Sequence, residues 1–187
     1  MPGKTGIWDK EEAKEHLFSY RLAQYIANLL DDYAQCTYDF GCGTGAYLRY
    51  LSDVGFNYCV GIEGSDLGKA FEYHPVYVHD LTQPIEYSTK GNVICLEVAE
   101  HIPAEHTNVF LNNICNHVAK GSHLIFSWAV PGQDGIGHVN CMPNSVVIKE
   151  LEGRGFEFIS DYTEQARKLI EPHLAYFKET ILIFRKK

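Results

Sequence analysis

Apolar positions along the chain alternate between helical and extended spacing. Between about residues 10 and 32 they recur at helical spacing, which predicts a helix ahead of the first strand. These positions are Leu17, Tyr20, Leu22, Tyr25, Ile26 and Leu29. Four later segments, residues 58–62, 76–78, 92–97 and 123–130, are mostly apolar runs of the kind found in central parallel strands. The sequence therefore predicts an α/β fold with a mostly parallel sheet.

Helical segments separate the predicted strands, and glycines mark where they end. The predicted helices span residues 47–54, 104–119 and 144–152, and the glycines that follow them are Gly55, Gly121 and Gly153. Asp161 and Glu164 have the spacing of a capping box, which predicts that a further helix opens there. A last run, residues 180–185, predicts a strand that closes the sheet.

Length and composition favour one folding unit. The chain has 187 residues and an apolar fraction of 45%, which is enough for one sizeable core. We expect a single domain over residues 1–187, with an N-terminal helical segment (1–33) and a core (34–187). The six cysteines form no CxxC pair, so we expect buried free thiols in a reducing compartment.

The charge balance argues against a polyanionic partner. The chain carries 16 basic and 24 acidic side chains, a formal charge of −8, so its surface should repel nucleic acid. The N-terminus shows no signal-peptide pattern, and no apolar stretch approaches the length of a bilayer span. We expect a soluble, cytoplasmic protein without a membrane partner, and its oligomeric state stays open.

The stretch from Asp39 to Gly45 carries the first chemical signal. A carboxylate at the end of an apolar run is followed by glycine at every second position, namely Gly41, Gly43 and Gly45. Such a loop turns tightly and lets a ligand approach the backbone, because no Cβ stands in the way. A second strand ends in an acid, Glu63, about 20 residues further on, where a Rossmann-like unit places its ribose-binding carboxylate.

Two cofactors fit this loop. A dinucleotide such as NAD or FAD is compatible with the glycines, but its pyrophosphate gains nothing from Asp39. S-adenosylmethionine gains from that acid, because it carries an ammonium and a sulfonium and no phosphate. Asp80 follows the third predicted strand, where it either meets an adenine amino group or forms a turn.

With these motifs in this order, the chain resembles the class I S-adenosylmethionine-dependent methyltransferases. The resemblance implies an enzyme with a Rossmann-like methyltransferase fold, helices on both faces of the sheet and an antiparallel C-terminal strand. It also implies that S-adenosylmethionine is the cofactor. The residues implied to bind it are Asp39, Gly41, Cys42, Gly43, Gly45, Glu63, Gly64, Asp80, Leu81 and Glu97.

A second cluster of candidate residues follows the fourth predicted strand. Glu97, Glu100 and His101 converge if the chain turns helically, because residues at i, i+3 and i+4 share a helix face. Two carboxylates held together raise each other's pKa unless a cation lies between them, which favours a metal. The alternative is that Glu97 alone touches the cofactor, while Glu100 and His101 cap a helix or pair with each other.

A long loop after the fifth strand supplies a further candidate ligand. Residues 131–143 contain three glycines between two prolines, which suits a shaped functional loop. His138 in this loop would complete a set of two acids and two imidazoles with Glu97, Glu100 and His101. Mixed oxygen and nitrogen ligands suit Mn²⁺, Fe²⁺, Co²⁺ or, less naturally, Mg²⁺.

This arrangement is similar to the ExxEH branch of the methyltransferases, which includes the small-RNA 3′-terminal 2′-O-methyltransferases and the quinone-biosynthesis O-methyltransferases. The resemblance implies Glu97, Glu100, His101 and His138 as metal ligands, and Glu97, His101 and His138 as catalytic groups. It implies methyl transfer to one hydroxyl of a vicinal diol, on a sugar, a glycan or a catechol. We expect the loop and the N-terminal helix, with Trp8, to line the acceptor pocket. The alternatives are an RNA terminal-ribose methyltransferase and a non-catalytic cofactor-binding module.

Overall fold

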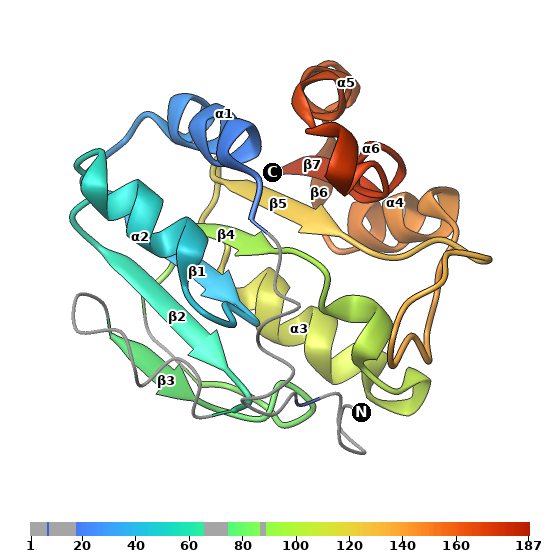
Figure 1. The fold of residues 1–187 in the computed structure, drawn as a ribbon. Coiled ribbons are helices and arrows are strands. Elements are labelled where there is room, and N and C mark those ends of the chain that lie inside the picture. The colour runs from blue at the N-terminus through green and yellow to red at the C-terminus, as the bar shows by residue number, and fades with distance from the viewer. Residues whose placement is uncertain (1–6, 8–17, 66–74, 87–88) are drawn as a thin grey trace.

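A twisted sheet forms the centre of the molecule (Figure 1). The computed structural model describes residues 7, 18–65, 75–86 and 89–187. Within them, seven strands lie in the order β3-β2-β1-β4-β5-β7-β6. Their bounds are β1 Thr37–Phe40, β2 Cys59–Glu63, β3 Val76–Val78, β4 Asn92–Cys95, β5 His123–Ser127, β6 Phe156–Phe158 and β7 Ile181–Lys186. The first five strands are parallel, and β7 runs antiparallel to both β5 and β6.

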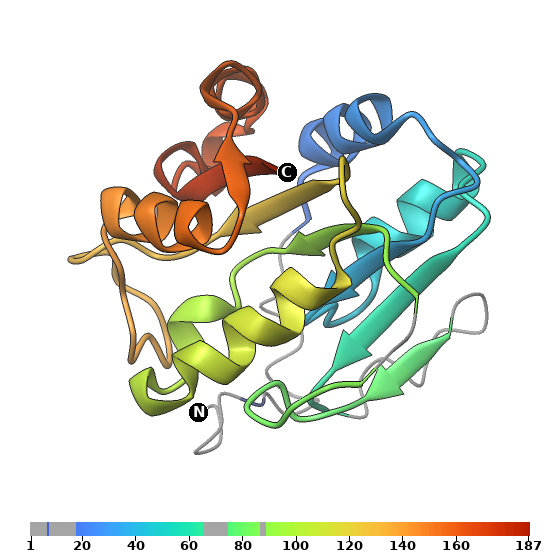
Figure 2. The same cartoon turned by 180° about the vertical axis from the view of Figure 1, so that it is seen from behind.

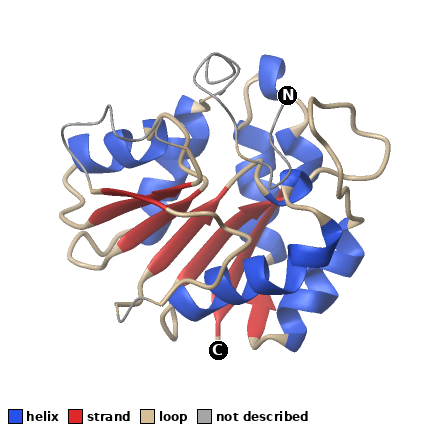
Figure 3. Ribbon diagram, turned by 90° about the horizontal axis from the view of Figure 1, so that it is seen from below, coloured by secondary structure: helices blue, strands red, loops and turns tan. Residues whose placement is uncertain are grey.

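Helices cover both faces of this sheet, as Figures 2 and 3 show from two further directions. The α-helices are α1 Tyr20–Leu30, α2 Ala46–Asp53, α3 Thr107–His117, α4 Asn144–Gly153, α5 Ser160–Leu169 and α6 Phe177–Thr180. The 3-10 helices are η3 Ala99–His101, η4 Ala104–His106 and η5 Pro172–Leu174. One apolar cluster joins the sheet to α3 and α4, and a second joins it to α1, α2 and α5. The predicted α/β architecture, with its antiparallel C-terminal strand, is confirmed.

Side chains of the central strands alternate between these two clusters. Val93 of β4 and Leu124 of β5 face α3 and α4, whereas Ile94 and Ile125 face the opposite layer. All four are fully buried. Burying such a side chain contributes about 1.5–3 kcal/mol, so the central strands are apolar on both faces for an energetic reason.

Several predicted boundaries shift in the structure. The fourth strand ends at Cys95 rather than residue 97, because Glu97 has a left-handed φ of 56° that no strand accommodates. The helix predicted to open at Asp161 is present as α5, but the capping box is not: α5 begins at Ser160 after Ile159. Asp161 therefore lies inside the first turn, where its negative charge interacts favourably with the helix dipole. Strand β6 was not predicted, because three residues carry too little periodicity.

The N-terminal helix is confirmed in part. Its described portion is α1, whereas residues 10–17 and Trp8 lie outside the described residues. Ser19 is the N-cap, and its hydroxyl accepts a hydrogen bond from the Leu22 N–H at 3.1 Å. Among the described helices, none combines the length and the apolar character needed to cross a membrane.

Candidate active site

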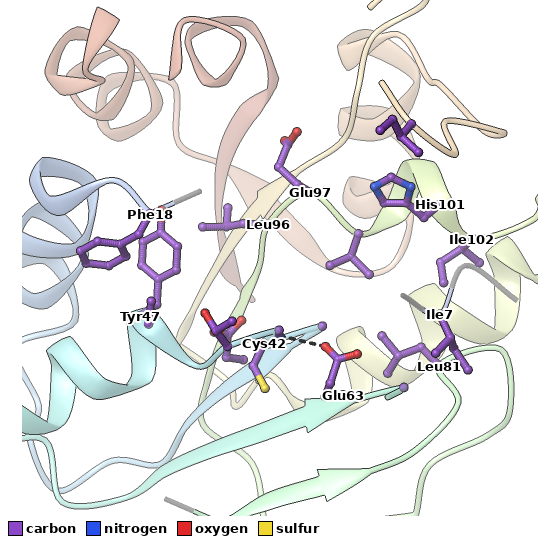
Figure 4. Close-up of a pocket in the computed structure, with 18 of the residues that line it drawn as sticks. Ile7, Phe18, Cys42, Tyr47, Glu63, Leu81, Leu96, Glu97, His101 and Ile102 are labelled. Atoms are coloured by element: carbon purple, nitrogen blue, oxygen red, sulfur yellow. Dashed lines mark hydrogen bonds between the residues drawn. The ribbon is translucent and has the colours of Figure 1, made fainter. Parts of the chain in front are cut away.

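A cavity of about 260 Å³ opens where strands β1, β2 and β4 end (Figure 4). Ligands of open α/β sheets bind at this edge, outside the carboxyl ends of the strands. Eight of the ten residues predicted to bind the cofactor line it: Asp39, Gly41, Cys42, Gly43, Glu63, Gly64, Leu81 and Glu97. Figure 4 shows Glu63 and Cys42 on one side of the cavity and Glu97 and His101 across from them.

The glycine loop needs its glycines for conformational reasons. Gly41, Gly43 and Gly45 all have positive φ, at 72°, 51° and 73°. Residues other than glycine rarely adopt a positive φ. The Gly43 N–H donates to Glu63 Oε2 at 2.8 Å, so the loop and the end of β2 are joined directly. Gly45 is the N-cap of α2 and is not among the residues that line the cavity.

Replacing Gly41 with alanine is expected to weaken binding of S-adenosylhomocysteine about tenfold and to lower the melting temperature. A side chain at φ 72° costs about 1–2 kcal/mol. Its Cβ would also collide with Val98, which itself lines the cavity. Isothermal titration calorimetry and thermal unfolding measure the two effects.

Gly121→Ala is the matched control for Gly41→Ala. Gly121 has a similar φ of 84°, but a Cβ there meets nothing within 4 Å among the described residues. The control should lower the melting temperature and leave S-adenosylhomocysteine binding unchanged. Equal affinities for the Gly41 variant and the wild-type protein would contradict a role of this loop in binding the cofactor.

Asp39 meets the cavity from the end of β1 and is 4% exposed. Burial, and then the negative charge of Glu63, raise the pKa of Asp39 to about 8. The ligand-free protein therefore holds this carboxyl largely protonated at neutral pH. A cation that enters the cavity and pairs with Asp39 would release the proton.

Asp80 forms a turn and is not among the residues that line the cavity. Its Oδ1 accepts hydrogen bonds from the N–H and the hydroxyl of Thr82, at 2.9 and 2.7 Å. The next residue, Leu81, does line the cavity. Asn113 of α3 holds this segment by donating to the Leu81 and Gln83 carbonyls, a contact that the sequence did not indicate. Contact between Asp80 and an adenine stays a prediction.

Three of the four predicted metal ligands come together beside the cavity. Potential ligand atoms of Glu100, His101 and His138 all lie within 4.8 Å of one another. His138 Nε2 is 4.0 Å from Glu100 Oε1, and the two imidazole rings have centroids 5.2 Å apart. His101 and His138 line the cavity, while Glu100 is fully buried behind them.

The chemistry of this group suits a divalent cation. Both oxygens of Glu100 are buried, and the carboxyl of Glu100 lies against the carboxyl of Glu97 and the backbone at Ala129. Burial, and then the charge of Glu97, raise the pKa of Glu100 well above its ordinary value. Two buried carboxyls in contact are costly unless a proton or a cation lies between them. The group therefore fits a metal.

Backbone carbonyls orient both imidazoles in the same way. His101 Nδ1 lies 3.1 Å from the Gly137 carbonyl, and His138 Nδ1 lies 3.2 Å from the Gln133 carbonyl. A carbonyl only accepts, so each Nδ1 carries the proton in the neutral ring and each Nε2 keeps its lone pair. Hydrogen bonds of this kind are typical of histidines that bind metals.

Glu97 is outside the group of three, although its carboxyl is hydrogen-bonded to the carboxyl of Glu100. Its N–H donates to Ser127 Oγ at 2.7 Å, and that hydroxyl donates back to Glu97 Oε1 at 2.8 Å. The Thr180 hydroxyl lies 3.4 Å from the same oxygen. These contacts hold Glu97 in its left-handed conformation, which costs free energy and marks functional sites. Neither hydroxyl was identified from the sequence.

Aromatic side chains line the rest of the cavity, and the sequence did not single them out. Phe18 and Tyr47 pack edge to face at 5.0 Å beside the glycine loop (Figure 4). Tyr176 and Phe177 approach from the start of α6. These residues come from segments far apart in the chain, so no local pattern reveals that they meet.

Known structures of methyltransferases resemble the whole chain. An amino pentose methyltransferase, CalS10 from Micromonospora echinaspora, superposes with a TM-score of 0.72 at 14% identity, over 96% of this chain and 98% of its own. The sugar N-methyltransferase KedS8 from Streptoalloteichus sp gives 0.68 at 15% identity, over 99% and 98%. Magnesium protoporphyrin IX methyltransferase from Synechocystis gives 0.63 at 18% identity, over 88% and 82%. These likenesses establish the fold.

Sequence comparison identifies the family. No curated protein sequence matches this chain. The profile of a methyltransferase domain family matches residues 13–161, which is most of the chain. The chain therefore belongs to the methyltransferase domain family and is an enzyme of that class.

Proposed function

We propose that this protein is an S-adenosylmethionine-dependent O-methyltransferase, assisted by a divalent metal, that acts on one hydroxyl of a vicinal diol such as a sugar or glycan. One observation carries the proposal. Glu100, His101 and His138 converge within 4.8 Å at the edge of the same cavity that the glycine loop and Glu63 line. A cofactor site and a candidate chelating site therefore share one space.

The cofactor side of the cavity suits S-adenosylmethionine. Asp39 offers a carboxylate to an ammonium, and Glu63 reaches the cavity from the end of β2, where ribose hydroxyls are bound in related folds. Two of the similar structures were determined with S-adenosylmethionine or S-adenosylhomocysteine bound. The bound cofactor supplies a methyl group on a sulfonium.

On the acceptor side, the proposed work of this chain is to hold a hydroxyl and receive its proton. A divalent cation held by Glu100, His101 and His138 would supply Lewis acidity to a chelated diol. His101 and His138 line the cavity, and if the cation leaves one of these rings uncoordinated, that ring accepts the hydroxyl proton as the general base. Alignment of the acceptor oxygen with the methyl group would add to the rate by lowering the entropic cost of bringing the two together.

N-methylation of an amino sugar is the second candidate. Glu97 lines the cavity, lies outside the group of three, and has its carboxylate held by Ser127. A fixed carboxylate there would orient an acceptor amine. Two similar structures are described as a sugar N-methyltransferase and an amino pentose methyltransferase, which supports testing amines beside diols.

The test is a paired acceptor assay. Purified protein, S-adenosylmethionine and Mn²⁺ are incubated with sugars and catechols that carry vicinal diols, and with the matching amino sugars. Mass spectrometry detects the methylated product. We expect an O-methylated diol whose formation stops in EDTA and returns with excess Mn²⁺, because the hydroxyl is activated by chelation.

Every different result of these experiments would contradict one part of the proposal. Undiminished turnover in EDTA would eliminate the metal, and N-methylated product alone would favour the second candidate. Cofactor binding without product on any acceptor would indicate a non-catalytic module. Binding to oligonucleotides that weakens steeply with salt would instead support an RNA methyltransferase.

A further inference from the structure

The loop that carries His138 is fastened to the turn that carries Glu100 and His101. The carbonyl of Glu100 accepts hydrogen bonds from the Val139 and Asn140 N–H groups, at 2.9 and 3.0 Å. On the cavity side, His101 Nδ1 contacts the Gly137 carbonyl. Two potential ligands and the loop of the third thus share one hydrogen-bond network.

Asn140 is the centre of this attachment and is 8% exposed. Its side-chain amide donates to the Ile102 carbonyl at 3.1 Å and to Thr107 Oγ1 at 3.0 Å. Its own carbonyl accepts a hydrogen bond from Trp128 Nε1, at the root of the loop. Asn140 therefore ties the loop to the turn after η3, to the start of α3 and to the segment after β5.

Apolar packing cannot replace these bonds. Ile136 and Val139, the apolar residues that flank His138, are 53% and 64% exposed. The hydrogen bonds of His138 itself, to the Gly135 and Gln133 carbonyls, stay within the loop. The position of His138 is consequently set by its neighbours in the loop, namely the Gly137 carbonyl on one side and Val139 and Asn140 on the other. Of these, Asn140 adds side-chain hydrogen bonds to residues outside the loop.

We propose that Asn140 is the positioning residue of the metal site: by clamping the loop to the Glu100 turn, it brings His138 to Glu100 and His101. The proposal rests on the metal part of the proposed function. Partners of this kind change metal affinity because ligands that are free to wander must be ordered by the ion itself. The effect should appear in metal binding without any acceptor present.

Three variants test the clamp. Asn140→Ala removes both side-chain hydrogen bonds, and Thr107→Val removes the acceptor of one of them from outside the loop. Thr107→Ser keeps the hydroxyl and serves as the conservative rescue. Mn²⁺ affinity is measured by electron paramagnetic resonance with S-adenosylhomocysteine present, and S-adenosylhomocysteine affinity by calorimetry. Amide hydrogen exchange of residues 131–139 in the metal-free protein is measured by mass spectrometry.

We expect Asn140→Ala to lower Mn²⁺ affinity at least about tenfold and to speed exchange in residues 131–139. Thr107→Val should lower the affinity about threefold, and Thr107→Ser should match the wild-type protein. S-adenosylhomocysteine affinity should stay within about twofold throughout, since none of the three variants touches its side of the cavity.

Asn92→Ala is the matched control. Asn92 is 1% exposed and also makes two side-chain hydrogen bonds, to Gln35 and to the His123 N–H, but at the opposite end of β4. It should destabilise the fold and leave both affinities unchanged. Wild-type Mn²⁺ affinity in both Asn140→Ala and Thr107→Val would overturn the inference and leave the proposed function standing. A wild-type protein that binds S-adenosylhomocysteine but no Mn²⁺ would overturn the metal part of the function, and this inference with it.

Discussion

Glu100→Gln is expected to lower Mn²⁺ affinity by at least about 100-fold while leaving the protein as stable as the wild type or more stable. Glutamine has the size of a protonated glutamate but offers no charge to a cation. The loss should be large because Glu100 is the only acid in the group of three described potential ligands. Removing a charged ligand from a buried site costs about 3 kcal/mol or more.

The stability half of this prediction follows from the direction of the pKa shift. Burial and the charge of Glu97 raise the pKa of Glu100, so the folded protein holds a proton that the unfolded chain releases. The free energy of unfolding therefore falls as pH rises above the ordinary glutamate value, until the raised pKa is reached. Glutamine has no proton to lose, so the variant escapes that loss and its advantage should grow with pH.

Thermal unfolding of the metal-free protein from pH 5 to pH 8 measures the stability. Titration with Mn²⁺ at pH 8 measures the metal affinity. Glu150→Gln is the control, because Glu150 is half exposed and pairs with Arg154 at 2.8 Å, away from the cavity. It should leave Mn²⁺ affinity unchanged. A Glu100→Gln protein that binds Mn²⁺ as tightly as the wild type would show that this group is not the metal site.

The candidate ligands were recognisable from sequence because the relevant spacing is local. Glu100 and His101 are neighbours, and His138 lies in a loop whose glycines and prolines mark it as shaped. Glu97 meets Glu100, but not through a shared helix face as predicted, because η3 begins only at Ala99 and Glu97 adopts a left-handed conformation before it. That conformation depends on Ser127 and Thr180, which are 30 and 83 residues away.

The contrast between local patterns and contacts of distant segments also explains which parts of the fold could be predicted. Apolar runs such as those of β4 and β5 reveal their burial in their own composition. The short strand β6 exists because it pairs with β7, and the Leu81 segment is placed by Asn113 of α3. Contacts between distant segments leave no periodic signal, so the residues that support the site could not be predicted, although its candidate ligands could be named from their local spacing.

Asp39→Asn is expected to stabilise the ligand-free protein increasingly as pH rises, and to weaken cofactor binding. The pKa of Asp39 is raised to about 8 by burial and by Glu63, whereas an unfolded chain releases this proton near the ordinary value of 3.8. Between these values the folded wild-type protein carries a proton that the unfolded chain lacks, so its free energy of unfolding falls with rising pH. Above about pH 8 the fall stops.

The size of the stability difference follows from the pH interval over which it is measured. From pH 5.5 to pH 8 the gap between variant and wild type should widen by about 3 kcal/mol, at roughly 1.36 kcal/mol per pH unit. For a chain of this length that is roughly 6–12 °C in melting temperature. Other titrating groups are common to both proteins and largely cancel in the difference.

Asp39→Asn should weaken cofactor binding, although it stabilises the ligand-free protein. The ammonium of S-adenosylhomocysteine gains from an ionised Asp39, so binding at pH 7 should release a proton, and the affinity of the wild-type protein should rise toward pH 8. An asparagine side chain offers no charge, so the variant should bind at least about tenfold more weakly at pH 8 and release no proton there. Calorimetry in two buffers of different ionisation enthalpy measures both quantities.

Asp53→Asn is the matched control for the Asp39 substitution. Asp53 lies on α2 with 71% of its side chain exposed, and its ion pair with Arg49 spans 3.9 Å at the surface. Such a pair contributes little, so neither the melting temperature nor cofactor affinity should change appreciably. If the gap between Asp39→Asn and wild type is the same at pH 5.5 and pH 8, Asp39 is already ionised in the empty cavity. Proton release on cofactor binding must then come from another group.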